Sequence, residues 1–266
     1  MKRAIMTCMS TDNYIYGVLK LNEKVWQYSK ETICVVCTQD IYDRYASVFS
    51  RDKIRAIVVG DIPLPQEFIN KMHGTDREYW ENTFIKLNLF DFEQYDKILY
   101  VDSDMLILGD LTPLFELDGL SAVDDGDFMI TGDFRGINSG ILVIEPDHQV
   151  YEQLIANIPN VIKEKGIIGD QDVLQYVFKD FKENKEKHLN IKYNANAYKL
   201  DSYSKDIDFQ VIHYIGSSKP WNWNPVYAWL RIMNYWLQGR KKTFKFVKMY
   251  YKDMRKLKNE TNINIV

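Results

Sequence analysis

Residues 97–108 read KILYVDSDMLIL: five residues of buried-strand type, then Asp102 and Asp104 separated by one residue, then a second apolar run. A short apolar run with polar ends is typical of a strand buried in a sheet. In an extended chain, side chains two positions apart point the same way, so both carboxylates are expected on one side. Neighbouring carboxylates repel unless a cation lies between them, and a hard divalent ion would meet that need. A solvated turn with two acidic residues is the alternative that the motif leaves open.

The first half of the chain alternates strand and helix patterns, which indicates a largely parallel α/β sheet. The strands expected there span residues 3–9, 32–38, 54–59 and 97–101. Apolar residues at steps of three and four predict a helix over 14–28, and a second helix is expected over about 78–90. The candidates for the cap of the first helix are Ser10, Thr11 and Asp12.

The second half of the chain contains shorter strand and helix patterns. Strands are expected at 121–123, 137–144 and 209–215, and a helix at about 171–181. The predicted architecture is one α/β domain over 1–239, a mostly parallel mixed sheet flanked by helices, with a helical basic extension over 240–266. In open parallel sheets ligands bind at the carboxyl ends of strands, which is where the Asp-x-Asp motif lies.

Composition is that of an ordinary globular protein: 46% of the 266 residues are hydrophobic and 27% are charged. The longest apolar runs are strand-sized, so no membrane span is expected, and the N-terminus indicates a first strand rather than a signal peptide. An odd count of cysteines (Cys8, Cys34 and Cys37) favours reduced thiols and a cytoplasmic location. Cys34 and Cys37 are three apart on a predicted strand, so they should face opposite ways and share neither a metal nor a disulfide.

Charge is concentrated near the end of the chain. Nine Lys/Arg and two Asp/Glu lie between residues 240 and 260, a local charge of +7 in a chain of net charge −3. A predicted helix over 244–258 places aromatic and aliphatic residues on one face and lysines on the other. Peripheral contact with an anionic membrane is one interpretation, and a helix docked on the domain with a solvated basic face is the other. Nucleic-acid binding is not expected, because this is the only basic stretch.

Five segments, with GDQDVLQ at 169–175 in support, together resemble the glycogenin-like retaining glycosyltransferases of family 8, whose relatives include galactinol synthases and bacterial lipopolysaccharide galactosyl- and glucosyltransferases. The five segments are CMSTDNYIYGVL at 8–19, FIKLNLF at 84–90, ILYVDSDMLIL at 98–108, INSGILVIEP at 137–146 and HYIGSSKPWN at 213–222. The resemblance implies a GT-A-like fold and the retaining transfer of a hexose from a UDP-sugar to a hydroxyl acceptor. That acceptor would be a saccharide, a polyol or a glycolipid.

The resemblance also implies roles for individual residues. Manganese or magnesium would be held by Asp102, Asp104 and His213. The nucleotide, its phosphates and the sugar would be bound by Met9, Ser10, Thr11, Tyr14, Arg77, Lys86, Ser103, Asp124, Asn138, Ser139, Gly216 and Lys219. The catalytic residues would be Asp170, Gln171 and Lys86. Each type has a structural alternative: a core histidine, a solvated lysine, or plain N-capping by Asp170.

Two departures from the family pattern matter. Ile167 stands where glycogenins have an acidic residue, which leaves the donor sugar open between glucose and galactose. No counterpart of the self-glucosylated tyrosine is found, so an external acceptor is expected. Because Gln171 is a poor nucleophile, we expect front-face attack through a short-lived ion pair rather than a covalent intermediate.

Two other functions remain open, and so does the oligomeric state. Asp102 could be the nucleophile of a haloacid-dehalogenase-type phosphatase, which also uses Asp-x-Asp after a strand. The chain could instead be a non-catalytic nucleotide-sugar-binding protein. A monomer and a homodimer are both open.

Overall fold

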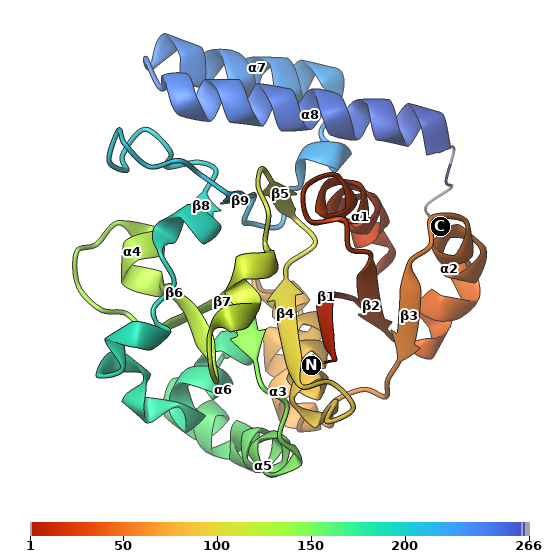
Figure 1. Cartoon of the computed structure of the whole chain (residues 1–266), viewed down its shortest axis with the longest axis vertical. Coiled ribbons are helices and arrows are strands. Elements are labelled where there is room, and N and C mark those ends of the chain that lie inside the picture. Colours follow the sequence, from red (N-terminus) through yellow and green to blue (C-terminus); the bar gives the residue numbers. More distant parts are fainter. Residues whose placement is uncertain (1, 262, 264–266) are drawn as a thin grey trace.

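A six-stranded sheet runs through the middle of the molecule, in the order β3-β2-β1-β4-β7-β6 (Figure 1). This computed structural model describes residues 2–261 and 263. The strands are β1 (Arg3–Met9), β2 (Ile33–Cys37), β3 (Arg55–Val58), β4 (Lys97–Val101), β6 (Ser121–Asp124) and β7 (Ile137–Ile144). β1 to β4 are parallel where they pair, and β7 runs antiparallel to both β4 and β6. The predicted α/β class with a mostly parallel mixed sheet is confirmed.

Strand side chains alternate between two hydrophobic cores, one on each face of the sheet. On β2, Val35 and Cys37 join the first core, whereas Cys34 and Val36 join the second. The period of two in a strand therefore separates Cys34 from Cys37, as predicted. Both thiols are free and buried.

Helices cover both faces. α1 (Ile15–Ser29) and α2 (Gln39–Arg51) bury their apolar sides in the first core. α3 (Gln66–Met72), α5 (His148–Lys165) and α6 (Asp170–Val177) contribute to the second. The short α4 (Asp125–Met129) directly follows β6. Short 3-10 helices span Asp12–Tyr14, Thr112–Glu116, Lys179–Lys182, Lys185–Lys187, Ile191–Tyr193 and Pro220–Asn222.

The predicted cap of α1 is wrong, whereas the second predicted helix is present but is of the 3-10 type. α1 is preceded by the 3-10 turn Asp12–Tyr14, and neither element has a side-chain cap. The hydroxyl of Ser10 donates to the carbonyl of Asn82 instead, and Asp12 pairs with Arg44. The segment Glu78–Asp91 is helical, but its turns are 3-10 rather than α. Because 84–90 is buried throughout, no single amphipathic face selects the α-helical period there.

A second sheet of three short strands, β5 (Met105–Ile107), β9 (Val211–His213) and β8 (Ala195–Asn196), lies beside the end of β4. β9 is the central strand, and His213 pairs with Met105 on one side and with Asn196 on the other. Met105 directly follows Asp104 in the chain. This register therefore carries His213 to the carboxylates, across more than a hundred residues of sequence.

The C-terminal helices α7 (Pro225–Leu237) and α8 (Lys241–Thr261) lie side by side across one end of the molecule (blue in Figure 1). Val247, Tyr250 and Met254 of α8 are fully buried in the first core. The ring of Tyr250 stacks on Tyr214, with centroids 4.1 Å apart. The expected C-terminal helix is thus present and docked. Among the helices in the described part of the chain, none has the length and apolarity to cross a bilayer.

Candidate active site

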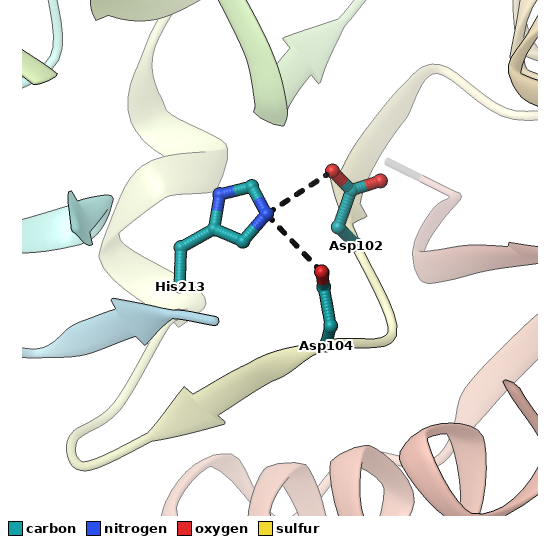
Figure 2. Close-up of side chains that lie close together, drawn as sticks. All are labelled: Asp102, Asp104 and His213. Atoms are coloured by element: carbon teal, nitrogen blue, oxygen red, sulfur yellow. Dashed lines mark ion pairs between the residues drawn. The ribbon is translucent and has the colours of Figure 1, made fainter. Parts of the chain in front are cut away.

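The turn between β4 and β5 carries both carboxylates of the Asp-x-Asp motif. Strand geometry ends before Asp102, so the turn itself, and not the period of two, makes the side chains converge. Figure 2 shows both aspartates facing His213, whose Nε2 lies 3.7 Å from Oδ2 of Asp102 and 3.2 Å from Oδ1 of Asp104. One ligand atom from each residue lies within 4.8 Å of the others. Two carboxylates and an imidazole at this spacing could hold a divalent ion.

A buried hydrogen-bond network sets the orientation of the His213 ring. Asn138 Oδ1 accepts from the backbone N–H of Gly140 at 3.2 Å, which identifies this atom as the amide oxygen. The Asn194 atom that lies 2.7 Å from the same oxygen must therefore be the amide nitrogen, Nδ2, which donates to it. Asn194 then presents Oδ1 to His213 Nδ1 at 3.0 Å, which makes Nδ1 the protonated nitrogen.

In the neutral ring, Nε2 therefore carries a lone pair and faces two carboxylate groups. Three electron-pair donors directed at one another are stable only with a cation among them, either a proton or a metal ion. The donor set of Asp102, Asp104 and His213 thus fits a divalent metal. The amide of Asn194 holds the tautomer that such a metal needs.

Two buried lysines flank the carboxylates. Lys219 forms an ion pair with Asp104. Lys86 Nζ lies 2.9 Å from Oδ2 of Asp170 and 3.4 Å from Oδ1 of Asp102, and it donates to the carbonyl of Ser139 at 3.1 Å. Lys86 is therefore not the solvated flank residue of the structural alternative.

The two aspartates differ in their electrostatic surroundings. Burial raises the pKa of Asp102, and this effect outweighs the opposing influence of Lys86. Burial acts in the same direction on Asp104, but Lys219 and His213 outweigh it and hold the pKa of Asp104 well below its usual range. Burial lowers the pKa of Lys86, but Asp102 and Asp170 outweigh it and the pKa is raised. Asp104 therefore loses its proton at a lower pH than Asp102 does.

These groups line a cleft of about 890 Å³, within the usual range of small-molecule sites. The sequence-predicted residues that line it are Ser10, Thr11, Tyr14, Lys86, Asp102, Ser103, Asp104, Ser139, Asp170, Gln171, His213, Gly216 and Lys219. They come from the end of β1 and the turn Asp12–Tyr14, the helix Glu78–Asp91, the β4–β5 turn, β7, the start of α6, and β9 with the loop after it. Segments far apart in sequence thus meet at the carboxyl ends of β1 and β4, which is where ligands are expected to bind in an open parallel sheet.

Four other predicted residues do not line the cleft. The side chain of Met9 is buried in the first core. Arg77 is exposed, with its guanidinium 4.7 Å from the ring centroid of Trp80. Asp124 caps α4 by accepting from the backbone N–H of Gly126 at 2.8 Å. Asn138 is buried and acts on the site through Asn194.

Asp170 and Gln171 open α6 and face the cleft. The N-cap of α6 is Gly169, whose N–H donates to Asp172 at 3.0 Å, so Asp170 is not the capping residue. Instead, its carboxylate pairs with Lys86. The side-chain oxygen of Gln171 accepts from the backbone N–H of Ser139 at 3.2 Å, so the group it can offer to a ligand is the amide donor.

Close packing fixes the positions of two glycines. A Cβ on Gly140, inside β7, would lie 2.7 Å from Cε1 of His213, so the ring lies directly over this backbone. A Cβ on Gly17 of α1 would lie 2.5 Å from the carbonyl oxygen of Ser103. The segment 138–140 is part of strand β7, as expected.

Sequence reasoning missed three supporting residues. Asn194 orients His213, Tyr100 donates its hydroxyl to Asp102, and Thr83 Oγ1 accepts from the backbone N–H of Asp170 at 3.2 Å. The position of Tyr100, two residues before Asp102 on the strand, was the one local signal available. Asn194 and Thr83 have no such signal, because their partners lie 19 and 87 residues away.

The fold is that of the GT-A glycosyltransferases. The galactosyltransferase LgtC, solved with donor and acceptor sugar analogs, superposes with a TM-score of 0.60 at 19% identity, covering 84% of this chain and 91% of that one. GlyE of Streptococcus pneumoniae TIGR4 superposes with a TM-score of 0.58 at 23% identity, covering 84% of this chain and 57% of that one.

Sequence comparison identifies the family. The model of Glycosyl transferase family 8 matches residues 5–224, and the chain belongs to that family. Glycogenin of Komagataella phaffii is 27% identical over 248 residues, covering 86% of this chain and 60% of its own length. Glycogenin-1 of Oryctolagus cuniculus is 28% identical over 234 residues, covering 83% and 66% respectively. The chain thus spans less than two thirds of the length of these relatives.

Proposed function

We propose that this chain transfers a hexose, glucose or galactose, from a UDP-sugar to a hydroxyl acceptor with retention of configuration. The observation that carries the proposal is the convergence of Asp102, Asp104 and His213 in a cleft that also contains two buried lysines. Family membership favours glycosyl transfer over the haloacid-dehalogenase-type phosphatase that the motif alone left open.

The cleft residues divide by charge and position. Asp102, Asp104 and His213 would hold manganese or magnesium, which neutralises charge developing on the diphosphate as the glycosyl bond breaks. Lys219 is paired with Asp104 and lies next to that position, so it would reach the diphosphate by a small movement of its ammonium group. Ser10, Thr11 and Tyr14, at the end of β1, would bind the nucleoside, and Gly216 would contact the diphosphate through its backbone.

The sugar would lie between β7 and the start of α6. Lys86, Asp170 and Gln171 meet there, and Gln171 offers an amide donor to a sugar hydroxyl. Asp170 is the carboxylate nearest this position, but its partner Lys86 neutralises it. We therefore infer front-face attack: the acceptor hydroxyl bonds to the anomeric carbon as the phosphate oxygen departs, and that oxygen takes the acceptor proton. Mass-spectrometric detection of a glycosyl–Asp170 adduct would overturn this step.

The acceptor would be an external saccharide, polyol or glycolipid. Tyr79 and Trp80 line the cleft on the side of the helix Glu78–Asp91, and the exposed face of Tyr79 is available to a sugar ring. Aromatic faces beside a donor site suit the apolar face of a pyranose.

A panel of nucleotide-sugars, each with and without manganese, tests the proposal by thermal shift. At a ligand concentration a hundredfold above Kd, the cognate UDP-sugar should raise Tm by roughly 5–10 °C, and only with the metal present. Hydrolysis of the same UDP-sugar without an acceptor distinguishes an enzyme from a non-catalytic binding protein.

Asp104→Asn is the informative variant, and Asp61→Asn, an exposed aspartate outside the cleft, is its matched control. The first should lose the manganese-dependent shift, whereas the second should keep it. A UDP-sugar shift that persists without metal, or in Asp104→Asn, would contradict the proposed site.

A further inference from the structure

The two C-terminal helices expose a surface that the proposed reaction does not use. Among the described residues, twelve large hydrophobic side chains are exposed, and six of them belong to the thirteen-residue helix α7. Trp229 is 63% exposed, Trp236 57% and Leu237 73%. Half of the exposed apolar side chains thus gather on one short helix, which marks it as an interaction surface.

The exposed residues of α7 form a stripe. Val226, Trp229, Leu230 and Leu237 follow steps of three, one and seven residues, which place them along one side of a helix. The opposite side carries Ala228, Ile232 and Tyr235, which are buried in the first core. α7 is therefore apolar on two faces, one docked on the domain and one open.

Basic residues of α8 border this stripe. A groove of about 660 Å³ between the helices is lined by Trp229, Ile232 and Met233 from α7 and by Lys248, Lys252 and Arg255 from α8. α8 buries its own apolar side, so its lysines face outward. The membrane interpretation, one of the two left open from sequence, placed the membrane-facing apolar residues on α8 itself, but the structure places Val247, Tyr250 and Met254 in the core.

We propose that the outer face of α7, together with the basic side of α8, docks on an anionic lipid bilayer. Residues 225–240 contain no acidic residue, and 240–260 carry a net charge of +7. An apolar stripe with tryptophans beside a row of lysines matches the apolar interior and negative surface of such a bilayer.

A second copy of the chain fits this surface less well. A twofold interface sets the same patch against itself, so the two basic rows would lie close together and repel. Between residues 240 and 260 the acidic residues are Asp253 and Glu260, and Oε1 of Glu260 already lies 3.7 Å from Nζ of Lys256. This surface therefore offers few acidic groups to a second basic row.

The proposal of a membrane-docking surface is independent of the transferase assignment.

Flotation of the full chain with vesicles tests the proposal. The chain should float with phosphatidylcholine vesicles that contain phosphatidylglycerol, and it should stay in solution with phosphatidylcholine alone. The double variant Trp229→Ser/Leu230→Ser should bind at least tenfold more weakly. Trp26→Ser/Tyr42→Ser is the matched control, because both side chains are exposed on other helices, and it should bind as the wild type does.

The contribution of the α8 lysines to vesicle binding is tested with a second pair of variants. Lys248→Gln/Lys252→Gln should weaken binding roughly 25-fold, since each lysine near an anionic surface contributes about a fivefold factor. Lys71→Gln/Lys163→Gln, exposed lysines on α3 and α5, should have no effect. All substituted side chains are exposed, so melting temperatures should stay near that of the wild type.

Three outcomes would overturn the inference. The first is that the full chain does not float with anionic vesicles, and the second is that the α7 variant floats as well as its control. The third is a dimer in buffer, detected by light scattering, that the α7 variant converts to a monomer, because the surface would then belong to a second copy.

Discussion

At the scale of single residues, the orientation of His213 depends on Asn194. Replacing Asn194 with Leu removes the acceptor of the His213 Nδ1 proton, whereas replacing it with Asp keeps one. Because such an outer partner fixes the tautomer of a metal ligand, we expect manganese to bind roughly 10–100-fold more weakly to Asn194→Leu than to the wild type. Asn194→Asp should retain most of the affinity.

Both Asn194 variants lose the donor to Asn138, so both should be less stable, by about 1–3 kcal/mol. The two variants should therefore lose a similar amount of stability, and the measurement that distinguishes them is the manganese Kd from isothermal titration. Equal Kd values for the Leu and Asp variants would show that Asn194 has a purely structural role.

Lys86 leads to a prediction about stability. Its ammonium group lies between Asp102 and Asp170, and it is almost wholly buried. Lys86→Met removes the ammonium group from between Asp170, which is buried, and Asp102, whose side chain is 26% exposed, and this should cost about 3–5 kcal/mol of unfolding free energy in urea with the metal chelated. Adding Asp170→Asn should recover part of that loss, because one uncompensated charge is removed. A double variant no more stable than the single one would contradict the electrostatic explanation.

The sequence predicted the residues of the cleft better than the contacts among them. Asp102, Asp104 and His213 lie in short local motifs, and the structure brings their side chains together. Asn194 is fully buried in the site, but it lies in the irregular stretch before β8, where no periodic pattern separates it from its neighbours. Its role follows from the pairing of β8 with β9, which only the folded chain reveals.

At the scale of elements, the first turn of α8 depends on a residue from a distant loop. Asp201 accepts from the backbone N–H groups of Lys242 and Thr243, each at 2.9 Å. Asp201→Ala should therefore lower the unfolding free energy by about 1 kcal/mol, the usual value of a capping side chain. Asp206→Ala, an exposed acidic residue of the same loop, is the control and should change little.

The pH dependence of this cap has a definite sign. Burial raises the pKa of Asp201, but the hydrogen bonds from Thr243 and Lys242 outweigh it, so its pKa in the folded state is lowered. A lowered pKa means that the cap contributes fully above the unfolded-state pKa of about 4, and that the contribution disappears as the pH falls through the folded-state pKa. The difference between wild type and Asp201→Ala should thus be constant from pH 5 to 7 and shrink below pH 4. A difference independent of pH would show that the carboxylate charge is not involved.

Elements were predictable where one periodic signal dominated. The strands β1 and β4 have the expected limits, because their buried apolar runs end at polar residues. The helix Glu78–Asp91 was predicted in place but not in type, since burial of its whole second half removes the amphipathic pattern. The cap of α1 was misassigned because Ser10 and Asp12 bond to distant segments rather than to the helix.

At the scale of the whole molecule, α8 closes the core that supports the candidate site. The sequence division into a domain over 1–239 and a tail over 240–266 raises the question of whether the first part folds alone. Tyr214 directly follows His213, stacks on Tyr250 of α8 and donates its hydroxyl to the carbonyl of Phe246 at 2.9 Å. An amphipathic pattern alone could not predict this docking, because burial in a protein core and binding to a membrane both require one apolar face.

Truncation after Gly239 would strip Val247, Tyr250 and Met254 from the first core, each of them fully buried. Loss of one such side chain costs about 2–5 kcal/mol, and a domain has about 5–15 kcal/mol in total. We therefore expect the 1–239 fragment to be unfolded or molten at 25 °C, with near-UV circular dichroism lost. Truncation after Asn259 retains all three residues and is the matched control, which should unfold in one cooperative transition like the full chain. A 1–239 fragment with native near-UV dichroism and sharp thermal unfolding would show that α8 is dispensable for the fold, and the support of His213 would then have to come from β5 and β8 alone.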